Sequence, residues 1–211
     1  MNADTGSLMA STIQPSFLGG LSRAAEHMSR WAVWFGGALT IGSVLLISFD
    51  VLVRKFFGFS TGGADELSSY AFAISTSWAL AFATLQRANV RVDVIYQYLP
   101  VRLSAIVDWL SLVALGVFMT MLTYYAYDVA ATSWMQNSAA NTPLATPLYI
   151  PQGLWLLGLI WMCVVLALML VRASVALVTG RIDEVKAIAG VRSTQEEAEE
   201  EAAAGERMVK G

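Results

Sequence analysis

Four long apolar runs, separated by short polar or charged segments, dominate the pattern of the chain. They cover about residues 31–53, 67–86, 103–127 and 150–171. A helix needs about 20 apolar residues to cross the hydrocarbon core of a bilayer, and each run reaches that length. The pattern therefore predicts an all-α integral membrane protein with four transmembrane helices.

The segments around the four runs divide the chain into three parts. Residues 1–21 lack the basic start and compact apolar core of a signal peptide, so we expect an uncleaved, disordered tail. The membrane domain then covers 22–181, and its first residues, 22–30, have the amphipathic spacing of a helix on the membrane surface. Residues 90–99 predict a short interfacial segment between the second and third spans. The end of the chain, 182–211, predicts an acidic, solvated and partly helical cytoplasmic tail.

Composition supports a membrane location. Hydrophobic residues make up 56% of the chain and charged residues 14%, and the mean hydropathy is +0.58. These values are too apolar for an ordinary soluble domain. The net charge of -3 comes from the tail, so the membrane domain itself is slightly basic. We expect the lipid bilayer, and no nucleic acid, to be a partner.

Basic residues indicate the orientation of the spans. Seven of them lie before the first span, between the second and third, or after the fourth: Arg23, Arg30, Arg87, Arg91, Arg102, Arg172 and Arg181. Only Arg54 and Lys55 lie between the first and second spans. Because cytoplasmic loops are enriched in Lys and Arg, both termini are predicted in the cytoplasm and the uncharged 129–149 loop outside.

Asp50 is the one charged residue inside the first predicted span. A carboxylate at the centre of a membrane helix costs roughly 2.5 to 3.5 kcal/mol, and the cost falls toward the helix end, where Asp50 lies. Arg54 follows one turn later, so the two side chains can pair on one helix face. An ion or proton site is the alternative interpretation.

Small residues recur every four positions in the second run, at Ala71, Ser75, Ala79 and Ala83. On a helix they form one smooth strip, which allows another helix to approach closely. Alanine and serine are also common in membrane helices in general, so the strip has an alternative explanation without a partner.

The residues needed for several kinds of chemistry are missing from the sequence. The only histidine, His27, precedes the first span, which argues against a haem held between helices. There is no Gly-Lys-Ser/Thr phosphate-binding motif, so ATP hydrolysis is not expected. The only cysteine, Cys163, lies in an apolar run and fits packing better than nucleophilic attack. We therefore expect no catalytic residues, no metal site and no cofactor.

The region around the second run resembles the small membrane subunit of tripartite ATP-independent periplasmic (TRAP) transporters. In that family a Glu-Leu pair near a helix start is followed by the helix and then by Arg-x-x-His-x-x-Val-Asp. The residues here are Glu66, Leu67, Arg87, Asn89, Val92 and Asp93, and Arg87 lies one position closer to Asn89 than the pattern has. Asparagine replaces the usual histidine, so no imidazole is available at that position. A looser resemblance in helix number and spacing extends over about 29–177.

The resemblance implies a non-catalytic subunit in a bacterial inner membrane. It would brace a large permease subunit that carries the substrate and sodium sites, for uptake of organic acids delivered by a periplasmic binding protein. The residues themselves favour a scaffold, because no predicted span has the interior proline that would break a helix at a substrate site.

Two groups of residues are candidates for contacts with these partners. Charges at the helix ends would fix the ends and contact the large subunit, or alternatively anchor the helices to lipid headgroups; they are Glu66, Arg87, Arg91 and Asp93, with Asp50 and Arg54. Polar and stiff residues of the outer loop would contact the binding protein; they are Asn137, Asn141, Pro143 and Pro147.

Two other classes of protein stay open. The chain could form a self-contained transporter or channel by oligomerising with copies of itself. It could also be a membrane enzyme acting on lipid or quinone, although the absence of an intramembrane histidine counts against this.

Overall fold

All the named secondary-structure elements in the described part of the chain are helices, as predicted. The computed structural model describes residues 16–60, 62–87, 100–190 and Gly205. Its helices are α1 (Ser16–Phe57), α2 (Ala64–Leu85), α4 (Val101–Met135), α5 (Tyr149–Val178) and α6 (Ile182–Ala189). The described residues contain no named strand, and one isolated β-bridge joins Ala139 to Pro147.

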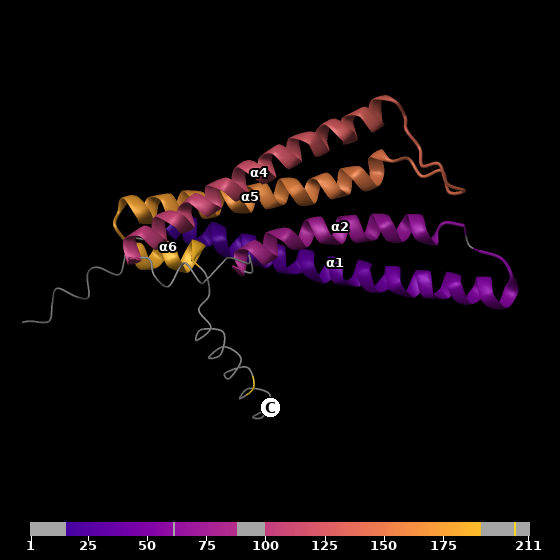
Figure 1. Cartoon of the computed structure of the whole chain (residues 1–211), viewed down its shortest axis with the longest axis horizontal. Helices are drawn as coiled ribbons and strands as arrows, with labels where there is room; N and C mark the ends of the chain where they lie inside the picture. The colour runs from indigo at the N-terminus through magenta and orange to yellow at the C-terminus, as the bar shows by residue number, and fades with distance from the viewer. Residues whose placement is uncertain (1–15, 61, 88–99, 191–204, 206–211) are drawn as a thin grey trace, which may run out of the picture.

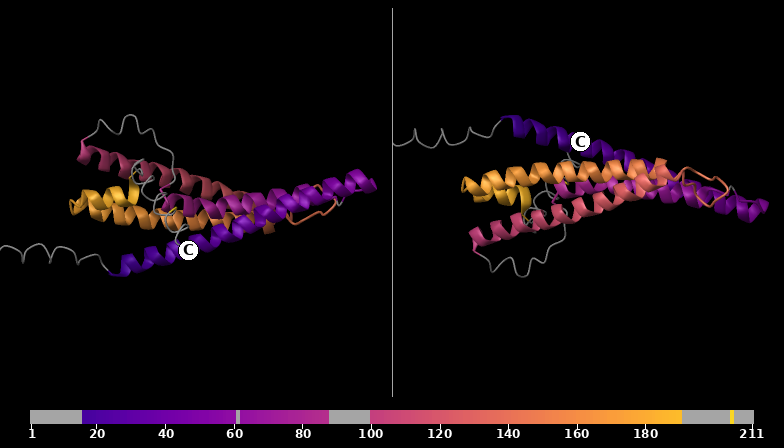
Figure 2. Two further views of the ribbon diagram at one scale, coloured as in Figure 1. Left: turned by 90° about the horizontal axis from the view of Figure 1, so that it is seen from below. Right: turned by 90° about the horizontal axis from the view of Figure 1, so that it is seen from above.

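Two helical hairpins form the body of the molecule. Figure 1 shows α1 and α2 lying along each other, with α4 and α5 forming the second pair. The two pairs join mainly through α2 and α5, and the short α6 packs against α4 and α5. Toward its N-terminus, α1 diverges from α4 and α5, as the two views in Figure 2 show.

Three helices are long and apolar enough to cross a membrane. They extend over Gly19–Phe57, Val101–Met135 and Tyr149–Val178, and they correspond to the first, third and fourth predicted spans. The predicted second span coincides with α2, whose 22 residues would reach about 33 Å at 1.5 Å per residue. Helix α2 is not among the three, and serines and threonines interrupt its apolar residues.

The helices extend beyond the apolar runs. The first, α1, is one helix of 42 residues from Ser16, so it includes residues predicted as tail and continues unbroken through the amphipathic 22–30 segment. That segment is therefore part of the first long helix and not a separate surface helix. The third span continues to Met135 in α4, eight residues past its predicted end. The predicted interfacial segment at 90–99 lies outside the described residues.

Helix α5 forms the centre of the packing. Its Leu159, Met162, Val165 and Leu166 are the largest completely buried apolar side chains of the main core. Indole N–H groups also connect this helix to its three long neighbours. Trp78 donates to the Leu154 carbonyl at 3.0 Å, Trp109 to Ser174 Oγ at 2.9 Å, and Trp161 to Ser29 Oγ at 3.1 Å. Each bond satisfies a polar group that would be costly to leave unpaired in hydrocarbon.

The start of the predicted solvated tail is a packed helix. In α6, Val185 is fully buried and forms a small cluster with Ala105 of α4 and Ala176 of α5. Arg181 and Glu184 form an ion pair of 2.9 Å at the beginning of the helix. Residues 182–189 therefore form a packed helix that closes the end of the α4–α5 pair.

Candidate functional site

Two connections meet at one end of the molecule. One joins α1 to α2 around Gly58–Gly63, and the other joins α4 to α5 through residues 136–148, as Figure 1 shows. We call this region the loop end. It contains two buried carboxylates, Asp50 and Glu66, which are 2% and 9% exposed.

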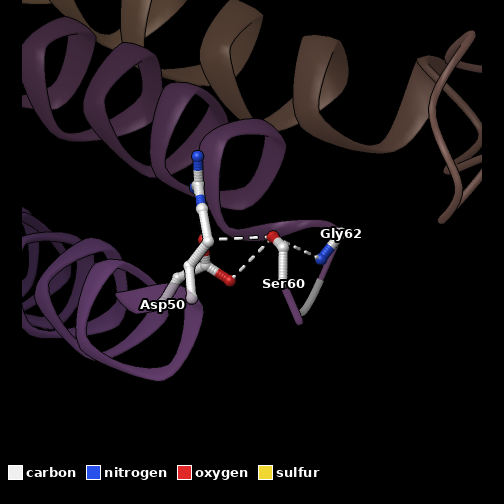
Figure 3. Close-up of polar contacts among 4 residues, drawn as sticks. Asp50, Ser60 and Gly62 are labelled. Carbon is white, nitrogen blue, oxygen red and sulfur yellow. Dashed lines mark hydrogen bonds and ion pairs between the residues drawn. The ribbon is translucent and has the colours of Figure 1, made fainter. Parts of the chain in front are cut away.

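Asp50 is bound by groups of its own helix and of the turn that follows it. A guanidinium nitrogen of Arg54 lies 2.6 Å from Asp50 Oδ2, so the ion pair expected from the spacing is present. The Ser60 hydroxyl donates to both carboxylate oxygens at 3.0 and 3.1 Å, and its oxygen accepts from the Gly62 N–H at 3.2 Å (Figure 3). The left-handed backbone at Gly58 and Gly62, with φ of 72° and 74°, allows the chain to turn back over the carboxylate.

Glu66, in the first turn of α2, connects that helix to the distant α4–α5 loop. Its carboxylate accepts a hydrogen bond from Tyr70 at 2.9 Å and another from the hydroxyl of Thr142. The side chain and backbone of Thr146 also favour the charged form of this carboxylate. Glu66 precedes the predicted span 67–86, and these donors, Thr142 first, hold the pKa of its carboxyl below the usual value because they stabilise the charged form.

Close packing adds to this connection. A Cβ atom at Gly63 would lie only 2.2 Å from Leu144 Cδ1, so the loop side chain occupies the space that a larger residue would fill. At Gly62 a Cβ would lie 3.6 Å from Pro143. The α4–α5 loop therefore rests directly on the α1–α2 turn.

The loop is a narrow hairpin. Ala140 donates its N–H to the Thr146 carbonyl and Leu148 to the Ser138 carbonyl, each at 3.0 Å. Thr142 to Ala145 form the tip, closed by a 3.0 Å bond from the Ala145 N–H to the Thr142 carbonyl. The four residues proposed from the sequence for partner contact are all exposed on this hairpin: Asn137, Asn141, Pro143 and Pro147.

The strip of small residues on α2 packs in part against α1 of the same chain. Ser75 is buried and accepts a 3.1 Å hydrogen bond from Thr40. A Cβ at Gly36 would lie 3.2 Å from the Cα of Ser75, so the two backbones approach closely there. Ala71 borders the same α1–α2 seam, while Ala79 and Ala83 are half-buried.

A second small face of α2, which the sequence reasoning missed, packs against α5. A Cβ at Gly158 would lie 2.4 Å from Ser77 Oγ, and the Thr84 hydroxyl contacts Met162 Sδ at 3.6 Å. Ala81, between them, is completely buried. The spacing of Ser77, Ala81 and Thr84 by four and three residues was the available signal, although it is less regular than the strip.

The remaining helix-end candidates follow α2 in the sequence. Arg87 donates to the Lys186 carbonyl of α6 at 3.4 Å, and this places a cation beside the C-terminal end of a helix, where the helix dipole favours it. Arg91 and Asp93 lie outside the described residues. In the part of the chain that is described, Glu66 and Arg87 thus hold the subunit's own elements together at opposite ends of α2.

The described residues show no arrangement suited to metal binding. No group of three His, Cys, Asp or Glu side chains among them is close enough to hold an ion. The Cys163 sulfur lies 3.3 Å from the Thr123 hydroxyl, and a neutral hydroxyl does not activate a thiol as a base would. The main feature of the loop end is therefore the attachment of the α4–α5 loop to Glu66 and to the α1–α2 turn.

Comparison with known proteins identifies the family. The family described as "Tripartite ATP-independent periplasmic transporters, DctQ component" matches residues 43–176. The match begins in α1, ends in α5, and includes the whole loop end. No curated protein and no solved structure gives a significant match. Because the family match covers more than half of the chain, the chain belongs to the DctQ family, the small permease component of TRAP transporters.

Proposed function

We propose that this chain braces the large permease subunit of a TRAP transporter in a bacterial inner membrane. The family supports a role within a tripartite system. The observation that carries the proposal is the surface of α1. Only 11% of its most apolar stretch is buried within the chain, against 33% in α5. An exposed apolar surface of this length fits lipid and a second membrane subunit.

The proposed topology has four spans with both termini in the cytoplasm. Chain continuity supports it, because α1 ends at the loop end while α4 begins at the opposite end, as Figure 1 shows. If α1 and α4 each cross the bilayer, α2 must cross back between them. It can do so because α1 and α5 flank it and cover the hydroxyls of Ser75 and Thr84.

Sodium coupling and the choice of an organic acid belong, in this proposal, to the large subunit. The family supports this division of labour, and so does the use of Asp50 in an ion pair and of Glu66 in holding the loop. The exposed hairpin at 136–148 would face the periplasm and contact the solute-binding protein there.

A mild-detergent pull-down of the tagged chain from its native host, followed by mass spectrometry, tests the bracing role. We expect one large polytopic membrane protein at fixed stoichiometry, and an unrelated tagged membrane protein should not recover it. Recovery of the chain with itself alone would refute the proposal. It would favour the homo-oligomeric transporter or channel, to which the exposed surface of α1 could equally contribute.

A further inference from the structure

The contacts of Glu66 connect two parts of the chain that are far apart in sequence. The carboxylate in α2 accepts a hydrogen bond from the Thr142 hydroxyl, 76 residues away, and Thr146 also favours its charged form. Leu144, between these threonines, lies against Gly63. The hairpin is therefore attached at its tip, by the hydrogen bond of Thr142 and by the packing of Leu144.

The attached hairpin has the properties of a preformed docking surface. Its backbone bonds close the tip, and Asn141, Pro143 and Pro147 are exposed. A segment that is already ordered loses less conformational entropy when a partner binds. Residues 129–149 contain no charge, so their contacts would be hydrogen bonds and shape complementarity, which salt screens little.

We propose that Glu66 is a positioning residue that fixes the 136–148 hairpin in the shape that docks the solute-binding protein. This inference rests on the proposed function. It assigns to Glu66 a role at the outer face in place of contact with the large subunit. It also predicts that the hairpin's contribution to docking is insensitive to salt.

Hydrogen exchange of the full-length chain in lipid nanodiscs tests the positioning role. In Glu66→Ala, peptides covering 136–148 should exchange about tenfold faster, because the hairpin loses a charged acceptor. The matched control is Asp65→Ala, an exposed carboxylate in the same turn, which should leave exchange within about twofold. Unchanged exchange in Glu66→Ala would overturn the inference.

A conservative pair separates this role from general destabilisation. Thr142→Val removes the hydroxyl and should loosen the hairpin, whereas Thr142→Ser retains a donor and should restore protection. If Glu66→Ala fails to fold, this pair decides the question alone. Equal exchange in the valine and serine variants would show that the hydroxyl bond to Glu66 does not fix the hairpin.

Binding of the transporter's own solute-binding protein to the two-subunit complex in nanodiscs tests the docking role. Glu66→Ala should weaken binding about fivefold through the added cost of ordering the hairpin, and Asp65→Ala should not. The loss should be similar at low and high salt. Faster exchange with unchanged affinity would overturn the docking role. If the wild-type complex binds no such protein, the proposed function fails, and the exchange result still decides whether Glu66 holds the hairpin.

Discussion

The two buried carboxylates at the loop end are stabilised in different ways. Asp50 is bound by Arg54, four residues away, and by Ser60, ten residues away. Glu66 is bound by Tyr70 nearby and by Thr142 across the fold. The first arrangement forms with the local helix and turn, whereas the second exists only after the two hairpins have packed.

Removing the cation from the first arrangement should destabilise the protein. In Arg54→Gln, Asp50 stays buried without that ion pair. We expect a lower melting temperature, with a smaller loss of stability than for a fully buried pair, because the arginine side chain is 56% exposed. Thermal unfolding in detergent measures this loss. The control is Lys55→Gln, which removes an exposed neighbouring cation, and an equal loss in both variants would contradict the argument.

This difference also explains how much of the site could be predicted from the sequence. A spacing of four on a helix places Asp50 and Arg54 together whatever the rest of the fold does, so their pairing was predictable. Glu66 was singled out, but its partners were not. The sequence does not indicate that the hydroxyl of Thr142 will bind an acceptor 76 residues away.

At the scale of elements, α5 depends on close approach to α2. The backbone at Gly158 is so near Ser77 that a Cβ would lie 3.0 Å from its carbonyl carbon. Gly158→Val should therefore force the helices apart and cost about 1 to 3 kcal/mol. Gly153→Val is the control, because a Cβ on Gly153 would have no atom within 4 Å. Similar melting temperatures for the two variants would show that α2 and α5 can move apart at Gly158 with little loss of stability.

Helix α6 should detach when its buried face becomes polar. Val185→Ser places an uncompensated hydroxyl in the Ala105–Ala176 cluster, at a cost of about 1 to 3 kcal/mol. Limited proteolysis should then cleave within 182–189 faster than in the wild type. Ala187→Ser, on the exposed face of the same helix, should leave the cleavage rate unchanged. Equal rates in the two variants would argue against packing of α6 through Val185.

Apolar runs predicted which helices exist better than they predicted where the helices end. The run that marks the third span stops near 127, yet α4 continues to Met135, because backbone hydrogen bonds extend a helix beyond the part that lipid would cover. A partly helical tail was predicted after residue 181, but the packing of α6 was not, because its apolar residues Ile182, Val185 and Ile188 stand among charged residues. Their spacing is that of one helix face, but three separate apolar residues do not form the long apolar run from which the other helices were predicted.

At the scale of the whole molecule, the proposed topology predicts opposite accessibility for the two ends. In a Cys163→Ser background, a single cysteine at Asn141 should react with a membrane-impermeant maleimide in intact spheroplasts. A cysteine at Thr179, which is exposed just after α5, should react only after permeabilisation. Both positions are exposed in the chain, so burial does not confound the comparison. The reverse pattern would invert the proposed orientation.

The length of α1 determines how far this subunit extends from the bilayer. At 1.5 Å per residue its 42 residues measure about 63 Å, roughly twice the 30 Å thickness of the hydrocarbon. If the exposed Trp31 and Trp34 mark the inner boundary, the stretch from Trp31 to Phe57 fills the membrane. The turns before Trp31 then project about 22 Å toward the cytoplasm. A fluorophore attached there would be held on a rigid rod, at a distance from the lipid surface fixed by the number of residues between it and Trp31.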